Sequence, residues 1–308
     1  MRCHNHAGEL RTGSGDARLL DLLRTLSGTG SVHSAFTRVV NLLTPDGTLI
    51  ALAARDCGDA PRTLVTEVAT WTEHGLEAGR GVTFATGNIS VDVPHPHRPL
   101  RLTTEGARPW HAAAPSLTAL PPGALAAAAT VLDGLCRTHG PLGGMLGAGP
   151  DAGPMEIAVV RALDEGRTTL VAGVRAGDDS RVRRGVLGLL GLGPGLTPAG
   201  DDFLTGLALV AALPGSRLAA FVPVLRDVLA EHGARTTALA LATLTEAADG
   251  RARAELIDLL RQLAEHRPAR DLNVPVRKVL AIGHTSGGDT LSGLVAGFRL
   301  EEELRGPL

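Results

Sequence analysis

GLGPGLTPAGDDFLTGL, residues 191–207, sets the architecture of the C-terminal part of this chain. A glycine-rich loop that carries Thr197 and Pro198 runs into two adjacent aspartates, Asp201 and Asp202. An apolar run with helical spacing follows them directly. The stretch predicts a loop-to-helix junction with two carboxylates in the first turn of the helix.

A second stretch repeats this pattern near the C-terminal end of the chain. SGGDTLSG, residues 286–293, aligns with AGDDFLTG, residues 199–206, and the two share a small first residue, a glycine, an aspartate, a leucine and a final glycine. Two junctions of one type predict one composite site, in which the loops near residues 200 and 288 face each other across a polar cleft.

The composition excludes several functional classes. The chain has 308 residues, enough for one large domain or two ordinary ones, and 44% of them are hydrophobic. Aromatic residues make up only 2%, with no Tyr, so stacking platforms for nucleic-acid bases are nearly absent. The net charge is −2 without a basic tract. We therefore expect no nucleic-acid or membrane partner.

The cysteines and the N-terminal segment indicate the compartment. Cys3, Cys57 and Cys136 are far apart and form no CxxC pair, so neither a disulfide framework nor a zinc knuckle is expected. The sequence shows no signal peptide and no run of about 18 apolar residues that would span a membrane. These features predict a soluble, cytoplasmic protein.

Strand and helix patterns are segregated along the chain, which predicts an α+β fold. The N-terminal part is β-rich, and its turn Thr44-Pro45-Asp46-Gly47 joins two of the expected strands. Segment 94–122 is rich in proline and reads as irregular chain with at most one more strand. The expected strands are 36–43, 48–54, 63–69, 80–85 and 88–93.

The part after residue 122 is helical, so we expect a β-rich domain over 1–122 and an α-helical domain over 123–308 that carries the Gly/Asp loops. Between its first two helices, GPLGGMLGAGPDAG (140–153) has the composition of a linker or a mobile loop. The expected helices are 123–138, 154–165, 178–190, 200–213, 216–231, 235–248, 251–265 and 287–299.

The first junction suits a bound anion. Gly193, Gly195 and Gly200 allow another group to approach the backbone closely, and the helix start offers exposed N–H groups with a partial positive charge. Alternatively, an aspartate at this position is a helix cap. The doubled aspartate, the length of the loop and its recurrence favour a site over a cap.

Paired carboxylates from the two junctions give this site its chemistry. Asp202 and Asp289 can hold a hard cation such as Mg²⁺ together with substrate oxygens, or either can act as a general base. Neither a Walker A sequence nor a dinucleotide-binding fingerprint is present. No cofactor is therefore certain.

The second junction adds titratable and hydroxyl groups. His284 can titrate near neutral pH, or it is an ordinary loop histidine. Thr285 and Ser286 supply hydroxyls, and Gly287 continues the loop. A nucleophilic role for Ser286 has only weak support, because GHTSGG resembles a nucleophile elbow loosely and no triad order is evident.

Further polar residues outside the two junctions are candidates. Arg235-Thr236-Thr237 is either an oxyanion contact with two hydroxyls or a plain helix start. Asn41 is a polar residue in an apolar strand, where it bonds the backbone or lines the site. The pairs His4/His6 and His95/His97 have a metal-like spacing but no third ligand.

These motifs resemble the AllH-type subunit of oxamate carbamoyltransferase. GLGPGLTPAGDDFLTG is similar to the family loop GLTPSGDDFLxG, Arg235-Thr236-Thr237 to its Arg/Ser-Thr-Thr helix start, and residues 283–293 to its late GxTSGxDxxxG. The segment HSAFTRVVNL, residues 33–42, looks like the family's N-terminal segment. The resemblance spans residues 30–298, with one departure: Ala199 stands where the family usually has Ser.

The resemblance implies a subunit that acts with two other proteins in allantoin catabolism, converting oxalurate and phosphate into oxamate and carbamoyl phosphate. We therefore expect a transferase (carbamoyltransferase) subunit with a small anionic substrate, phosphate and other subunits as partners. The alternatives are a non-catalytic subunit that docks partners, or a metal-dependent hydrolase, since GGDTLSGLVAG loosely resembles the acidic loop of ADP-ribosylglycohydrolases.

The expected site residues follow from these motifs. The catalytic candidates are Asp202, Asp289 and His284, of which Asp202 and Asp289 would also hold any metal. The expected substrate- or phosphate-binding residues are Gly193, Gly195, Leu196, Thr197, Gly200, Asp201, Arg235, Thr236, Thr237, Thr285, Ser286, Gly287 and Asn41.

Overall fold

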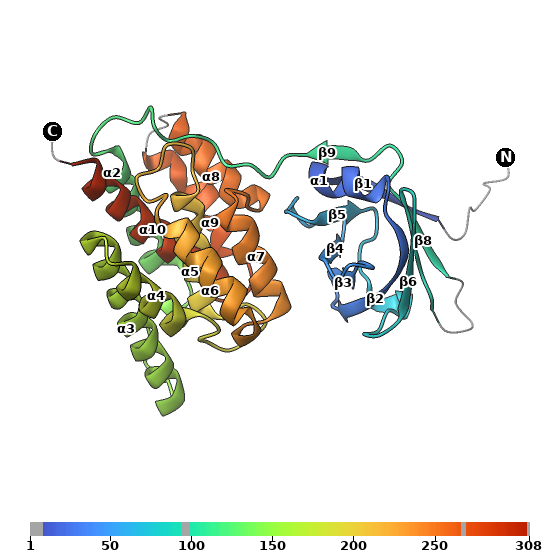
Figure 1. The fold of residues 1–308 in the computed structure, drawn as a ribbon, viewed down its shortest axis with the longest axis horizontal. Coiled ribbons are helices and arrows are strands. Elements are labelled where there is room, and N and C mark those ends of the chain that lie inside the picture. The colour runs from blue at the N-terminus through green and yellow to red at the C-terminus, as the bar shows by residue number, and fades with distance from the viewer. Residues whose placement is uncertain (1–8, 94–98, 266–268, 307–308) are drawn as a thin grey trace. The chain divides into compact units, whose positions relative to one another are not determined.

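The chain forms two compact units, residues 1–112 and 113–308 (Figure 1). The computed structural model describes residues 9–93, 99–265 and 269–306. Strands occupy the first unit and helices the second, which confirms the α+β class. Residues 113–122, which composition grouped with the β-rich part, bond within the helical unit: the Ala114 N–H donates to the Gly250 carbonyl oxygen at 2.9 Å.

The N-terminal unit is a mixed β-barrel of eight strands with a ninth strand added outside the ring. The ring closes because β1 pairs antiparallel with β5 and parallel with β8. The ninth strand, β9, pairs parallel with the C-terminal end of β1. Helix α1 (Ala17–Leu23) follows β1. The strands are β1 Glu9–Asp16, β2 Ser27–Ala35, β3 Val39–Leu43, β4 Leu49–Ala53, β5 Thr63–Thr66, β6 Gly81–Ala85, β7 Asn88–Val91, β8 Leu100–Thr103 and β9 Arg108–Trp110.

The barrel is held together by aliphatic side chains that point inward from alternate strand positions. In β6, Val82 and Phe84 are buried while their neighbours are exposed, and Leu42 and Leu52 of β3 and β4 are fully buried. The expected turn between β3 and β4 is confirmed, since Gly47 has a φ of 82° and the Asp46 carboxylate accepts from the Thr48 N–H at 3.2 Å.

The helical unit is built around α5, whose residues are all buried (Figure 1). Helix α10 packs against α5 and α2, α7 against α5, and α3 against α4. The helices are α2 Ala124–His139, α3 Pro154–Ala176, α4 Asp179–Leu189, α5 Ala199–Ala211, α6 Phe221–His232, α7 Ala238–Ala248, α8 Ala254–Ala264, α9 Asn273–Leu280 and α10 Ser286–Arg305, with short 3-10 turns η2 Gly144–Leu146, η3 Gly233–Arg235 and η4 Ala269–Leu272. A further 3-10 turn, η1 Thr72–His74, belongs to the N-terminal unit.

The structure corrects several expected elements. The five expected strands are confirmed as β3–β7, but β1, β2, α1 and α9 were missed, and segment 94–122 contains two strands, β8 and β9. β2 reads SGTGSVHSA and has few apolar residues, so its sequence does not indicate a strand. It is a strand because it pairs with β3 on one side and with β6 on the other. Helix α3 continues to Ala176. No helix in the described part of the chain has the length and apolar character to cross a membrane.

Candidate functional site

The first Gly/Asp junction is a tight loop between α4 and α5. After α4 ends, the Leu192 N–H donates to the Leu189 carbonyl oxygen at 2.9 Å, and the Gly200 N–H donates to the Leu192 carbonyl oxygen at 2.9 Å. A Cβ on Gly200 would overlap the Leu189 carbonyl oxygen. Glycine is required at this position because the start of α5 presses against the end of α4.

The second junction, between α9 and α10, has the same construction. The Ile282 N–H donates to the Val279 carbonyl oxygen at 2.9 Å, and the Gly287 N–H donates to the Ile282 carbonyl oxygen at 3.1 Å. A Cβ on Gly287 would overlap the Val279 carbonyl oxygen. The repeated sequence thus folds into two pseudo-equivalent halves.

The two halves meet where α5 crosses α10 at the last glycine of each repeat. A Cβ on Gly206 would lie 3.0 Å from the Cα of Gly293, so the two backbones are in contact. Asp202 and Asp289 each lie about one helical turn before these glycines. The crossing therefore brings the two carboxylates together, and the negative charge of Asp289 acts on Asp202.

Asp201 ties the first loop to the start of α7. Its Oδ1 accepts from the Gly191 N–H at 2.9 Å, and its Oδ2 accepts from the Thr236 hydroxyl. Burial raises the pKa of Asp201, and these two hydrogen bonds oppose that rise. Helix α5 has no side-chain cap at its first residue. Asp201 therefore serves as a clamp between loops.

Asp202 is the more strongly perturbed carboxyl group of the pair. Burial raises its pKa to about 8, hydrogen bonds from Ser286 and Thr197 lower it, and the charge of Asp289 raises it. The Thr197 and Ser286 hydroxyls lie 2.8 Å apart and join the two junctions. The Oδ2 atom of Asp202 is buried and has no hydrogen-bond partner among the described residues.

Asp289 is held by a segment that the composition predicted to be a linker or a mobile loop. The Met145 N–H, in the 3-10 turn η2, donates to Asp289 Oδ1 at 2.6 Å. Burial raises the pKa of Asp289 to about 6, while hydrogen bonds from Met145 and Thr285 lower it. Gly144 has a φ of 53°, and a Cβ there would overlap the carboxylate. The segment is thus a wall of the site.

Asp202 and Asp289 share a second feature besides their raised pKa values. Asp289 Oδ2, like Asp202 Oδ2, is buried without a partner in the described part of the chain. Since burial raises the pKa of Asp202 to about 8 and of Asp289 to about 6, the pair holds one proton near neutral pH. Such a pair can supply one acid and one base.

The glycine-rich loop of the first junction is fastened to α7. Thr237 caps α7 by accepting from the Ala240 N–H at 3.1 Å, and its hydroxyl donates to the Leu196 carbonyl oxygen at 2.6 Å. Gly193 and Gly195 have φ values of 126° and 94°. The Arg-Thr-Thr segment therefore acts on the site through its two threonines.

The remaining predicted residues are placed outside these contacts. His284 and Arg235 are exposed in the turns before α10 and α7, and neither side chain bonds to any residue that the structure describes. Asn41 lies in β3 of the barrel, where its side-chain N–H donates to Ser34 Oγ at 2.9 Å.

The four histidines with metal-like spacing, His4, His6, His95 and His97, lie outside the described residues. Within residues 9–93, 99–265 and 269–306, no three His, Cys, Asp or Glu side chains are grouped so that they would hold a metal ion.

Two family models match the chain. A model described as oxamate carbamoyltransferase subunit AllH matches residues 189–298, a span that contains both Gly/Asp junctions. A model described as the AllH family N-terminal domain matches residues 11–109, which form most of the β-barrel unit. No solved structure matches the chain.

Proposed function

The chain belongs to the AllH family of oxamate carbamoyltransferase subunits, part of allantoin catabolism, and on that premise we propose that its helical unit contributes catalytic groups to carbamoyl transfer. Asp202 and Asp289 move the proton, and the two loop-to-helix junctions bind the anionic substrate. One observation carries this proposal: each carboxyl group has a buried Oδ2 atom without a partner, and the two groups lie on facing junctions.

The proton balance of the reaction calls for such a pair. When a phosphate oxygen attacks the carbamoyl carbon of oxalurate, the bond from that carbon to the oxamate nitrogen breaks. The phosphate loses a proton and the leaving nitrogen gains one. Asp289, as the carboxylate, accepts the first proton, and Asp202, as the acid, donates the second. Proton exchange between the two groups then restores the starting state.

The helix starts supply the charge complement for the anions. Neither α5 nor α10 has a side-chain cap. The Gly200 and Gly287 N–H groups donate to the carbonyl oxygens of Leu192 and Ile282, so the attraction for phosphate or a carboxylate comes from the positive ends of the two helix dipoles. The hydroxyl groups of Thr197 and Ser286, 2.8 Å apart, join the two junctions. In the alignment of the two junctions, Ser286 of the second corresponds to Ala199 of the first. At this position only the second junction has a hydroxyl.

A divalent cation is a second possible occupant of the same oxygens. Mg²⁺ is commonly bound by one or two carboxylates together with substrate phosphates, and the Oδ2 atoms of Asp202 and Asp289 are suitable donors. If the cation is used, activity falls with a chelator and returns with Mg²⁺. If the chelator does not change the rate, no cation is used, and the two carboxyl groups act only by transferring protons.

The proposal is tested by reconstitution with the partner subunits, following carbamoyl phosphate formed from oxalurate and phosphate. Asp202→Asn and Asp289→Asn should each lower the turnover number by about 10²–10⁴-fold. Asp258→Asn, an exposed aspartate in α8, is the matched control and should leave the rate unchanged. If both site variants keep the full rate, the chain is a docking subunit and the assignment is wrong.

A further inference from the structure

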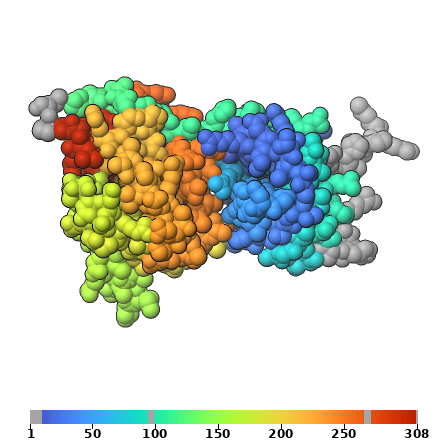
Figure 2. All heavy atoms as spheres, in the orientation of Figure 1, coloured from blue at the N-terminus to red at the C-terminus, as the bar shows by residue number. Residues whose placement is uncertain are grey.

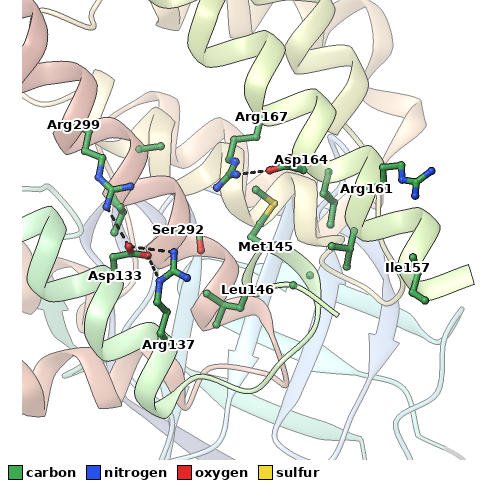
Figure 3. A pocket seen from close by; sticks show the side chains of 16 residues that line it. Asp133, Arg137, Met145, Leu146, Ile157, Arg161, Asp164, Arg167, Ser292 and Arg299 are labelled. Atoms are coloured by element: carbon green, nitrogen blue, oxygen red, sulfur yellow. Dashed lines mark hydrogen bonds and ion pairs between the residues drawn. The ribbon is translucent and has the colours of Figure 1, made fainter. Parts of the chain in front are cut away.

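A cavity of 480 Å³ lies in the helical unit (Figure 3). Helices α2, α3 and α10 form its walls, and the loop Gly144–Gly147 contributes to its lining. Asp202 and Asp289 are not among its lining residues. The volume falls within the range of small-molecule sites, roughly 300–1,000 Å³.

The cavity exists because α3 packs on α4 and only loosely on α10. Gly166 of α3 presses against Leu189, and Gly173 against Val182, so the glycine face of α3 is used by α4. The space between α3 and α10, here called the seam, is lined by long side chains. Figure 2 shows the N-terminal end of α3, in light green, projecting from the helical unit, in agreement with the exposure of Met155.

Positive charge dominates the seam. The charged residues that line the cavity give an excess of two positive charges. They are the arginines Arg137, Arg161, Arg167 and Arg299 and the aspartates Asp133 and Asp164.

Arg167 pairs with Asp164, whereas the other three arginines are more weakly engaged. Asp133 is shared between Arg137, at 3.4 Å, and Arg299, at 3.2 Å, as Figure 3 shows. Arg161 makes no ion pair with any residue that the structure describes. Because exposed ion pairs contribute only about 0–1 kcal/mol each, an incoming anion can replace the aspartate as the partner of a guanidinium.

We propose that this cavity binds a small organic dianion, a metabolite that carries two negative charges on a short apolar body. The guanidinium groups hold the charges, and the side chains of Leu146, Leu163 and Val295 contact the body. This inference rests on the charge and shape of the cavity, and it does not depend on the proton transfer proposed for Asp202 and Asp289.

The site communicates with the carboxylate pair through its lining loop. Met145 belongs to the cavity lining, and its N–H donates to Asp289 Oδ1 at 2.6 Å. A ligand in the cavity therefore lies against the loop that fixes Asp289. Occupancy should slow hydrogen exchange at the Met145 amide.

Calorimetry on the full chain at low salt tests the proposal with two probes, malonate and phenyl phosphate, and with malonamide as the uncharged analogue. Both dianions should bind saturably with one site, more weakly at high salt, and malonamide should not bind. The double variant Arg161→Met/Arg299→Met should weaken binding at least tenfold.

Two control variants make the result decisive. Arg261→Met removes an exposed arginine outside the cavity and should leave the affinity unchanged. Asp202→Asn should also leave it unchanged, which separates this site from the proposed catalytic one. Absence of saturable binding by both dianions overturns the proposal. So does a loss of affinity in Asp202→Asn that the arginine variant does not share.

Discussion

Gly206 and Gly293 touch through their backbones, since a Cβ on either glycine would lie 3.0 Å from the Cα of the other. This contact fixes the crossing of α5 and α10. The site depends on it, because Asp202 and Asp289 stand about one turn before the two glycines and share one environment only while the helices remain this close.

Gly206→Ala should therefore destabilise the fold. The added methyl group would overlap the Thr290 carbonyl oxygen, a backbone atom that moves only if α10 moves. We expect a loss of about 1–3 kcal/mol in the free energy of unfolding, measured with denaturant. Gly134→Ala in α2 is the control, because nothing lies within 4 Å of its added Cβ. That substitution should stabilise by roughly 0.5–1 kcal/mol.

The stability of the protein should fall as the pH rises between about 4 and 8. Burial raises the pKa of Asp202 from 3.8 to about 8, so in this window the folded state holds a proton that the unfolded state has lost. The contribution is complete below pH 4 and disappears as the pH passes 8, with a slope of up to about 1.4 kcal/mol per pH unit.

Asp202→Asn isolates this effect. Burial raises the pKa of Asp289 only to about 6, so between pH 6 and 8 the slope should come mainly from Asp202 and should be reduced in the variant. Denaturant unfolding at a series of pH values measures it. Equal slopes for the variant and the parent chain in that range would show that the pKa of the Asp202 carboxyl group is not raised.

Asp201→Ala should loosen the loop before α5. It leaves the Gly191 N–H and the Thr236 hydroxyl without their acceptor, a cost of about 1–3 kcal/mol for each buried group that stays unpaired. Hydrogen exchange at Gly191 should accelerate. In Thr236→Ser, which keeps the hydroxyl, the Gly191 amide should exchange at the rate of the parent chain. In Thr236→Val, which lacks the hydroxyl, it should exchange faster. Unchanged protection of Gly191 in Asp201→Ala would contradict the clamp.

Gly144→Ala should impair the site without unfolding the helical unit. Its Cβ would overlap the Asp289 carboxylate, and its φ of 53° is unfavourable for alanine. With the Met145 N–H displaced, the pKa of Asp289 should rise further, because that hydrogen bond lowers it.

The measurement is the pH dependence of the reconstituted reaction, whose acidic limb should move to higher pH in Gly144→Ala. Gly149→Ala, in the same loop, is the matched control, because its added Cβ would meet nothing within 4 Å and its φ is not positive. A pH profile that does not shift, or that shifts equally in both variants, would remove η2 from the site.

The sequence predicted the helical junctions well because their information is local. Two equally spaced sets of residues mark the glycines at which backbones approach and the positions of the two carboxylates. They are Gly200, Asp202 and Gly206 in the first junction and Gly287, Asp289 and Gly293 in the second. The turn at residues 44–47 likewise predicted the two strands that flank it, β3 and β4. The closing strand β1 reads ELRTGSGD, and its partners β5 and β8 are distant in the chain, so no local pattern marks it.

The sequence by itself determined the α+β class, the family and the pair of Gly/Asp junctions, because each of these is marked by the order of residues within short stretches of the chain. Only the tertiary structure decided that the Met145 N–H holds Asp289 and that Asp201 joins the Gly191 N–H to the Thr236 hydroxyl. These roles depend on which distant backbone groups reach a buried carboxylate. Burial and hydrogen bonding, which set its pKa, arise only when the whole unit has packed.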